Sequence, residues 1–214
     1  MKVTVIDYGL SNLLSVRRAL EACGAQAEVT GSRAAVSAAQ ALVLPGVGAF
    51  EDGMKGLAAL SLIDVIQEKC AAGTPLLGIC LGMQMLFDES EEFGPHPGLG
   101  LIPGRVERIP ETDAQGTLQR VPHIGWEPVR PPAGRTFAGT VFASVPENRE
   151  MYFVHSYEAK PARAADRLAE AEYGGRSLCA AAQRGRVIGC QFHPEKSGEA
   201  GLAVLRHYLT LCGA

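Results

Sequence analysis

Long apolar runs, a strong excess of charge of one sign and a secretion signal are all missing from this sequence of 214 residues. No apolar run approaches the ~18 residues of a membrane span, so we expect no membrane segment. The formal net charge of −3 gives no electrostatic reason to expect nucleic acid as a partner. The first apolar stretch reaches Asp7 too soon for the core of a signal peptide. These absences predict a cytoplasmic protein.

The six cysteines have neither metal-binding nor disulfide spacing. They stand at positions 23, 70, 80, 179, 190 and 212, without a C-x-x-C pair. The sequence therefore predicts no zinc site and no disulfide framework. It also lacks the Gly-Lys-Ser/Thr of a P-loop. We expect a reduced protein without metal or cofactor, in which only Cys80 stands in a context that suggests chemistry.

The first half of the chain alternates strand-like and helix-like segments. Strands are expected at Lys2–Asp7, Ala27–Thr30, Ala41–Leu44 and Leu76–Ile79, and helices at Asn12–Ala22, Arg33–Ala39 and Leu62–Ala72. This alternation predicts an α/β fold with an open, mostly parallel sheet flanked by helices.

After Phe87 the pattern changes to short β runs broken by turns. Asp88–Gly98 is expected to be a surface loop, residues 110–120 and 130–149 are the least structured by composition, and Gly198–Leu211 is a closing helix. Strands are expected at Arg105–Ile109, Met151–Val154, Arg167–Tyr173, Leu178–Ala182 and Val187–Gln191, with hairpin turns at Gly174-Gly175 and Arg184-Gly185. These runs predict an antiparallel β extension. Because no repeat or linker divides the chain, we expect a single domain over residues 1–214.

Residues 78–82 read Gly-Ile-Cys-Leu-Gly, between an apolar run and a helix-compatible run. This is the cysteine form of a nucleophile elbow, in which small flanking residues allow a strained turn to present one side chain at the top of a sheet. Ligands of open α/β sheets bind at that edge, and a helix N-terminus favours a thiolate. Tight strand–helix packing is the alternative interpretation of the glycines. The position favours Cys80 as a nucleophile.

Residues 191–195 read Gln-Phe-His-Pro-Glu and supply a base and a carboxylate. Pro194 disfavours helix at the residue before it, which predicts an extended segment. Alternate side chains of a strand share one face, so His193 and Glu195 are expected to lie together. With Cys80 they make the nucleophile, the base and the orienting carboxylate of a catalytic triad.

Pro45-Gly46-Val47-Gly48 follows the third expected strand, again at a carboxyl end. A simple turn is one interpretation. The other is an oxyanion hole, in which N–H groups of Val47 and Gly48 act together with that of Leu81, just after the nucleophile. Gln84 projects one helical turn from Cys80, and the pattern leaves open whether it is a surface residue or a substrate contact.

These segments resemble the class I (triad) glutamine amidotransferases nearly end to end. Gly78-Ile-Cys-Leu-Gly-Met-Gln84 and Phe192-His-Pro-Glu-Lys-Ser197 carry the resemblance to the family. Four segments resemble one branch of it, the glutaminase subunits of imidazole glycerol phosphate synthase: Asp7-Tyr-Gly-Leu-Ser-Asn-Leu13, Pro45-Gly-Val-Gly48, Pro122-His-Ile-Gly-Trp126 and Tyr152-Phe-Val-His-Ser-Tyr157. Ser11 and Glu127 depart from the pattern of that branch, in segments that it uses near its partner.

The resemblance implies that Cys80, His193 and Glu195 hydrolyse glutamine to glutamate and ammonia without a cofactor. It implies a heterodimer with a (β/α)8-barrel cyclase, which uses the ammonia to make imidazole glycerol phosphate and aminoimidazole carboxamide ribotide in histidine biosynthesis. The implied glutamine contacts are Gly48, Gln84, Ser156 and Tyr157. The implied cyclase-facing residues are Asn12, Lys196 and, in an expected loop over residues 122–126, Pro122, His123, Gly125 and Trp126.

The same residues disfavour two other functions. A triad amidotransferase that feeds a purine, pyridoxal or anthranilate pathway is disfavoured by the Pro45–Gly48 and Pro122–Trp126 segments. A catalytically inactive relative that acts as a binding module is disfavoured by the intact triad.

Overall fold

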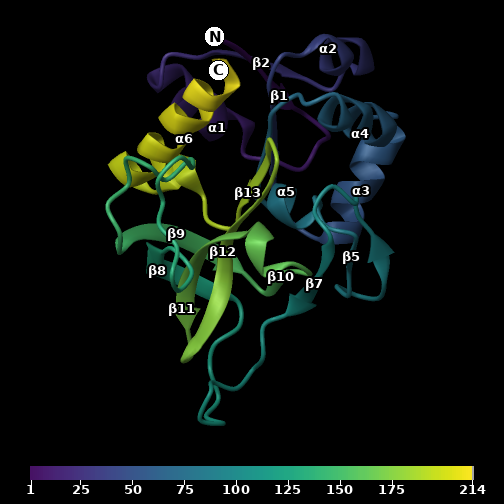
Figure 1. The fold of residues 1–214 in the computed structure, drawn as a ribbon. Helices are drawn as coiled ribbons and strands as arrows, with labels where there is room; N and C mark the ends of the chain where they lie inside the picture. The colour runs from purple at the N-terminus through teal and green to yellow at the C-terminus, as the bar shows by residue number, and fades with distance from the viewer. Residues whose placement is uncertain (214) are drawn as a thin grey trace.

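Nine strands form one continuous sheet, in the order β2-β1-β3-β4-β13-β12-β11-β8-β9 (Figure 1). The computed structural model describes residues 1–213. Neighbouring strands from β2 to β13 in this order are parallel, and those from β13 to β9 are antiparallel. The bounds are β1 Lys2–Ile6, β2 Gln26–Thr30, β3 Leu42–Gly46, β4 Leu76–Cys80, β8 His123–Arg130, β9 Arg149–His155, β11 Arg167–Tyr173, β12 Arg176–Arg184 and β13 Val187–Cys190. The predicted parallel sheet with an antiparallel extension is confirmed.

Helices cover both faces of the parallel strands. One cluster of buried apolar side chains contains Val16 and Leu20 of α1 and Val204 and Leu205 of α6. The other cluster contains side chains of α2, α3 and α4. The helices are α1 Leu13–Ala22, α2 Arg33–Ala38, α3 Phe50–Ala59, α4 Ile63–Ala71, α5 Leu81–Gln84 and α6 Gly198–Gly213, with 3₁₀ turns η1 Ala164–Asp166 and η2 Pro194–Lys196. Burial on both faces accounts for the continuous apolar runs of β3 and β4.

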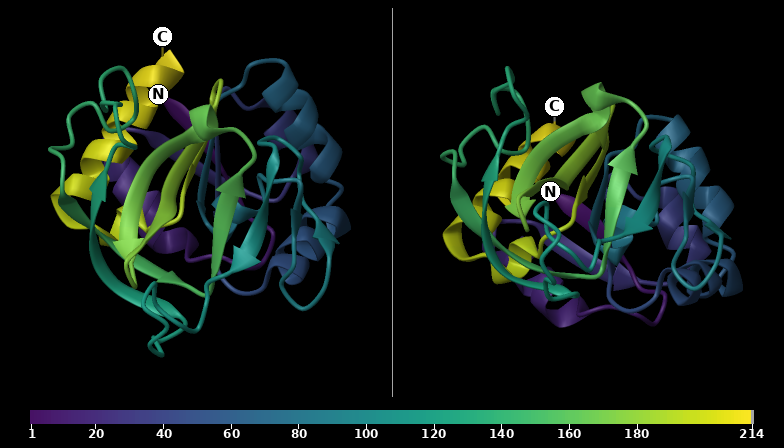
Figure 2. Two further views of the ribbon diagram at one scale, coloured as in Figure 1. Left: turned by 60° about the horizontal axis from the view of Figure 1, so that its bottom comes forward. Right: turned by 90° about the horizontal axis from the view of Figure 1, so that it is seen from below.

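A second, four-stranded sheet has the order β10-β7-β5-β6. Its strands are β10 Tyr157–Pro161, β7 Gly104–Arg108, β5 Glu89–Ser90 and β6 His96–Pro97. The antiparallel strands and this second sheet lie at the end of the molecule opposite the two chain ends (Figures 1 and 2). β9 of the large sheet and β10 of the small one are separated only by Ser156, so the two sheets meet at this point of the chain.

The structure differs from the sequence expectation in several elements. Helix α3 was not expected, because Gly53 and Gly56 lower the helix propensity of its segment. The expected loop Asp88–Gly98 contains the two short strands β5 and β6. The expected loop Pro122–Trp126 lies mostly in strand β8, which pairs with β9 from His123 to Val129.

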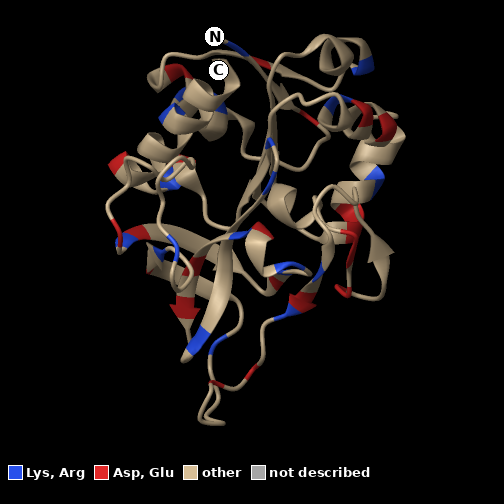
Figure 3. Ribbon diagram, viewed as in Figure 1, with Lys and Arg blue, Asp and Glu red and all other residues tan. Residues whose placement is uncertain are grey.

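The surface carries charges of both signs. Figure 3 shows Lys and Arg interspersed with Asp and Glu along the ribbon. Several of these charges form exposed ion pairs, such as Lys2 with Glu28 and Lys55 with Glu51. Such pairs contribute little to stability. In the described residues 1–213, no helix is both long enough and apolar enough to cross a membrane.

Candidate active site

Three neighbouring strands bring the predicted catalytic segments together. β4 ends at Cys80, and its neighbours β3 and β13 end at Gly46 and Cys190. Because these strands are parallel, their carboxyl ends meet at one edge of the sheet. Val47 follows β3 directly, and His193 follows β13 by three residues. The sheet order therefore places the nucleophile between the oxyanion segment and the base.

The turn at Cys80 is strained, as the elbow interpretation predicts. Cys80 has φ 56° and ψ −111°, a conformation that side chains other than glycine rarely adopt. The glycines on either side are required by packing. A Cβ on Gly82 would lie 1.8 Å from the carbonyl oxygen of Leu44 in β3, and one on Gly78 would lie 2.6 Å from the carbonyl oxygen of Gly82. Backbone strain of this kind is a mark of functional sites. The following helix α5 has only four residues, so its dipole supports a thiolate less than the sequence suggested.

His193 and Glu195 are paired, although not in the way that was expected. His193 Nδ1 lies 2.8 Å from Glu195 Oε1, and both side chains are almost fully buried. The extended conformation of His193 is confirmed, with φ −98° and ψ 97°. Glu195, however, belongs to the 3₁₀ turn η2 that begins at Pro194. The prediction of one strand face was therefore wrong, and the turn brings the carboxylate back to the imidazole.

The surroundings of His193 favour its charged form. Burial disfavours the imidazolium, but the adjacent Cys80 and the hydrogen-bonded Glu195 outweigh burial and raise the pKa of His193 to about 9. Because Nδ1 faces Glu195, the buried Nε2 is the nitrogen left to exchange a proton with Cys80. This is the arrangement of a base held by a carboxylate.

The oxyanion segment is held at two points. The hydroxyl of Tyr8 donates to the carbonyl of Pro45 at 2.8 Å, and the Val47 N–H donates to the carbonyl of Leu10 at 3.0 Å. Gly48 follows with φ +100°, which only glycine adopts without strain. In this conformation the Val47 N–H points away from the cavity. Its predicted role as an oxyanion donor stays a prediction and requires the peptide to turn.

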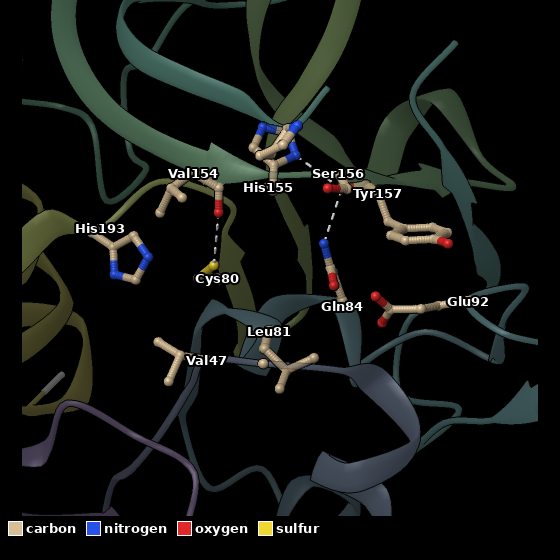
Figure 4. Close-up of a pocket in the computed structure, with 12 residues that line it drawn as sticks. Val47, Cys80, Leu81, Gln84, Glu92, Val154, His155, Ser156, Tyr157 and His193 are labelled. Atoms are coloured by element: carbon tan, nitrogen blue, oxygen red, sulfur yellow. Dashed lines mark hydrogen bonds between the residues drawn. The ribbon is translucent and has the colours of Figure 1, made fainter. Parts of the chain in front are cut away.

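A cavity of about 340 Å³ lies in front of Cys80. Its lining includes every residue predicted for the triad, the oxyanion hole and the glutamine contacts, except Glu195. These residues are Val47, Gly48, Cys80, Leu81, Gln84, Ser156, Tyr157 and His193. Figure 4 shows Cys80 and His193 at one end of this cavity, and Gln84, Tyr157 and Glu92 at the other. Gln84 is 6% exposed, so the surface interpretation is wrong and it faces the cavity.

Four residues of the cavity lining were not predicted to lie there: Glu92, Val154, Pro122, which was expected to face the partner, and His155, which was expected to be structural. Glu92 is the acidic group among them, and its carboxylate also accepts the N–H of Phe50 at 2.7 Å. The sequence offered only an acidic stretch, which is typical of solvated loops. The pairing of β5 with β7 folds this stretch over the cavity.

Most residues expected to face a partner are on the surface. Asn12, Pro122, Trp126 and Lys196 are exposed, and Gly125 is half-buried. Trp126 lies beside the Tyr152 ring, at 5.7 Å between centroids, and the ammonium of Lys196 lies 5.8 Å from the same ring. His123 differs, because its side chain is only 1% exposed. His123 is the first residue of β8, and its ring stacks on Phe153 and Tyr173 instead of facing solvent, so its predicted contact with a partner stays a prediction.

His155 has the structural role expected from the sequence rather than that of a second base. His155 Nδ1 donates to the carbonyl of Tyr157 at 2.8 Å, and His155 Nε2 lies 3.1 Å from His123 Nδ1. Burial lowers the pKa of His155 to about 3 and that of His123 to about 4, so both rings are neutral at pH 7. In residues 1–213, no group of three His, Cys, Asp or Glu side chains is arranged to hold a metal ion.

A family model described as glutamine amidotransferase class-I matches residues 4–210. The chain belongs to this family. It is 46% identical over 210 residues to the imidazole glycerol phosphate synthase subunit HisH 1 of Legionella pneumophila strain Lens, covering 98% of this chain and 99% of that protein. It is 46% identical to the HisH subunit of Syntrophotalea carbinolica, covering 96% and 98%. The resemblance to the family and to its HisH branch is confirmed.

Solved structures confirm the fold. A crystal structure of a glutamine amidotransferase matches with a TM-score of 0.74 at 21% identity, covering 99% of both chains. The structure of PurLQS from Thermotoga maritima matches with a TM-score of 0.72 at 19% identity, covering 98% of both chains. At these identities the likeness concerns the α/β architecture alone.

Proposed function

We propose that the chain is the glutaminase subunit of an imidazole glycerol phosphate synthase, with Cys80, His193 and Glu195 as its catalytic residues. The observation that carries the proposal is a strained Cys80 beside a carboxylate-paired His193, at one end of a cavity sized for an amino acid. The relatives named HisH support the pathway, and the triad assignment rests on this geometry.

The first half of the reaction forms a thioester. His193 Nε2 takes the thiol proton, and the Cys80 sulfur attacks the side-chain amide carbon of glutamine. The oxyanion that develops accepts hydrogen bonds from the Leu81 N–H and from the Val47–Gly48 segment. The C–N bond then breaks, and His193 delivers its proton to the departing ammonia. Glu195 stabilises the imidazolium throughout, as its 2.8 Å contact requires.

The second half releases glutamate. His193 takes a proton from a water molecule, which attacks the thioester carbon. The C–S bond breaks, and the proton returns from His193 to the Cys80 sulfur. Glutamate leaves, and the triad regains its initial state. No cofactor takes part in these steps.

Glutamine would lie across the cavity with its two ends held differently. The amide end reaches Cys80, and Gly48 lies beside it in the oxyanion segment. At the opposite end, the Glu92 carboxylate is complementary to an α-ammonium group, and Ser156 and Tyr157 line the wall. Gln84 contributes an amide oxygen to the same wall.

The partner would be a (β/α)8-barrel cyclase that receives the ammonia. The relatives' names as subunits of a synthase support a second subunit. The exposed aromatic and cationic group of Trp126 and Lys196, together with Asn12 and Pro122, offers a docking surface next to the cavity. Trp126 is 50% exposed, and an exposed tryptophan is a common centre of interfaces. We also propose a cytoplasmic location, because all six cysteines are free thiols. We propose a single domain, because one continuous sheet contains strands from both halves of the chain.

Replacing the nucleophile tests the proposal. Cys80→Ala should abolish glutamine-dependent synthesis by the complex with a barrel cyclase and leave ammonia-dependent synthesis intact, because only glutamine hydrolysis needs the thioester. Parallel assays with glutamine and with ammonium salt measure both activities. Glutaminase activity retained by the variant would refute the assignment of Cys80.

A second assay tests the coupling to the cyclase. Because the Val47 N–H is bonded to Leu10 in the isolated chain, one oxyanion donor is absent. The loss of one such donor costs roughly 10²–10³ in rate. The chain alone should therefore be a poor glutaminase, and cyclase with its nucleotide should stimulate it by about that factor. Trp126→Ala should weaken the stimulation. An isolated chain that already matches the assembled complex would rule out this switch.

A further inference from the structure

Gln191 is a fully buried side chain that the triad does not explain. It is 0% exposed and follows the last residue of β13, two residues before His193. Its backbone N–H donates to the carbonyl of Ala180 at 2.9 Å, which fixes the main chain here. A buried amide is costly unless its side-chain groups find partners, so these partners indicate what the residue does.

The partners of Gln191 are two residues of the site. Its Oε1 accepts a hydrogen bond from Gln84 Nε2 at 3.0 Å, and its Nε2 lies 3.8 Å from the Cys80 sulfur. Gln84 Nε2 also donates to the backbone carbonyl of Tyr157 at 2.9 Å, an interaction that Figure 4 draws as a dashed line. The three side chains and the carbonyl form one connected chain of hydrogen bonds.

The direction of this chain is fixed by the carbonyl at its end. A carbonyl only accepts, so the NH₂ group of Gln84 must face Tyr157. The second hydrogen of that NH₂ group then requires an acceptor, which makes the oxygen of Gln191 face Gln84. The NH₂ group of Gln191 is left to face the sulfur of Cys80. The orientation of both amides thus follows from one backbone group.

The Cys80 sulfur lies between an acceptor and a donor. The carbonyl of Val154, at 3.9 Å, suits the protonated thiol, and the NH₂ group of Gln191, at 3.8 Å, suits the thiolate. Cys80 is 7% exposed, so water contributes little to solvating a negative sulfur. When His193 removes the proton, the contact with Val154 loses its hydrogen and the contact with Gln191 strengthens, because hydrogen bonds to charged acceptors are the stronger ones.

We propose that Gln191 stabilises the Cys80 thiolate through its side-chain NH₂ group and, through its oxygen, holds Gln84 with the amide oxygen turned to the substrate. The proposal rests on the glutaminase function stated above and adds a fourth polar residue to the triad. Gln84 has both amide hydrogens engaged by Tyr157 and Gln191, so its Oε1 is the group left for a donor in the cavity.

Two substitutions separate the electronic role from packing. Gln191→Glu keeps the shape but replaces the donor with a second acceptor, which repels a thiolate. Gln191→Met removes the donor and changes the shape. A role in packing alone predicts that glutamate is the milder change, whereas stabilisation of the thiolate predicts that glutamate is the more harmful one.

The readout is the pH dependence of Cys80 alkylation by iodoacetamide in the full chain, followed at the Cys80 peptide by mass spectrometry because five other thiols are present. The alkylation pKa should rise by about one in Gln191→Met, a roughly ten-fold loss of thiolate at fixed pH, and further in Gln191→Glu. The kcat for glutamine should fall in the same order. Gln67→Met is the matched control, since Gln67 donates only to the Leu99 carbonyl, away from the cavity. It should leave the alkylation pKa unchanged.

The outcomes distinguish this inference from the proposed function. An alkylation pKa unchanged in both Gln191 variants, with parent glutaminase activity present, overturns the role of Gln191 alone. A raised pKa without glutaminase activity in any complex overturns the function but keeps the contact. If Gln191→Met does not fold, the isosteric Gln191→Glu still decides, because a parent-like pKa in that variant contradicts the proposal.

Discussion

Acidification from pH 7 to pH 5 should destabilise the protein, because the fold buries two histidines side by side in their neutral forms. His123 is 1% and His155 is 7% exposed. The hydrogen on His155 Nδ1 is committed to the carbonyl of Tyr157, so His155 Nε2 accepts from His123 Nδ1. A proton added to His155 would put two hydrogens into the 3.1 Å contact between the rings. The arrangement therefore requires His155 to be neutral, and burial keeps His123 neutral as well.

The size of the effect follows from the pKa values. Burial lowers the pKa of His155 to about 3 and that of His123 to about 4, against about 6.5 in an unfolded chain. Below pH 6.5 the unfolded state binds more protons than the folded one, so stability is lost as the pH falls. In this range each histidine lowers the free energy of unfolding by about 1.4 kcal/mol for each unit by which the pH falls. At pH 5 the pair should have cost about 4 kcal/mol, a large part of a typical stability of 5–15 kcal/mol.

Other ionisable groups act on the same pair. Glu127 Oε1 lies 3.4 Å from His123 Nε2 and favours a charged ring, whereas His193 disfavours a charge on His155. Burial also raises the pKa values of Glu127 and Glu158, which adds stability as the pH falls. The pH dependence of the unfolding free energy of the parent protein is therefore the sum of all these contributions. A comparison with a variant that lacks one histidine isolates the contribution of the pair.

Chemical denaturation between pH 5 and pH 8 measures this comparison. In His123→Phe, the aromatic ring can keep its stacking with Phe153 and Tyr173, and one titrating group is removed. The slope of unfolding free energy against pH should fall by up to about 1.4 kcal/mol per pH unit below pH 6.5. Phe142→Leu, in the same apolar cluster as Phe153, should lower stability equally at every pH. Equal slopes in the parent and His123→Phe would refute the argument.

Two further predictions concern the triad and the elbow. Glu195→Gln removes one of the groups that raise the pKa of His193, so the imidazole should titrate below about 9 by NMR. Glutaminase turnover should fall less in this variant than in His193→Ala. Equal or reversed losses of turnover, with the fold intact, would mean that the roles of the two residues are misassigned. Gly82→Ala should cost about 1–3 kcal/mol or more of unfolding free energy and reduce Cys80 reactivity, because its Cβ would clash with the Leu44 carbonyl. Gly125→Ala is the control, because a Cβ at this position would meet no atom within 4 Å.

The sequence was sufficient for the parts of the site that depend on local chemistry. The elbow could be predicted because a turn at Cys80 needs small residues at Gly78 and Gly82, and the packing distances show that need directly. Strand alternation placed the turn at the carboxyl edge of a parallel sheet. His193 and Glu195 were paired correctly, but Pro194 starts a 3₁₀ turn that alternation on a strand does not describe.

The elements that were missed depend on tertiary packing. Gly53 and Gly56 argue against a helix, yet α3 needs them, because a Cβ at these positions would lie 2.7 Å from the Met85 sulfur and from the Tyr8 carbonyl oxygen, respectively. Strand β8 contains Pro128, which lacks the N–H of a central strand. It is tolerated because β11 pairs with β8 only at Val129 and Arg130, which leaves the edge at Pro128 free.

Gln191 and Glu92 were missed for a different reason, since each acquires its role only through a partner far along the chain. Gln191 is separated by 111 residues from Cys80 and by 107 from Gln84. The Tyr157 carbonyl that orients both amides lies where the two sheets meet, and it also receives the hydrogen of His155. One backbone acceptor therefore fixes the buried histidines on one side and the amides next to the nucleophile on the other. Because buried polar groups are costly to leave unpaired, sharing this one acceptor favours a single arrangement of the rings and the amides.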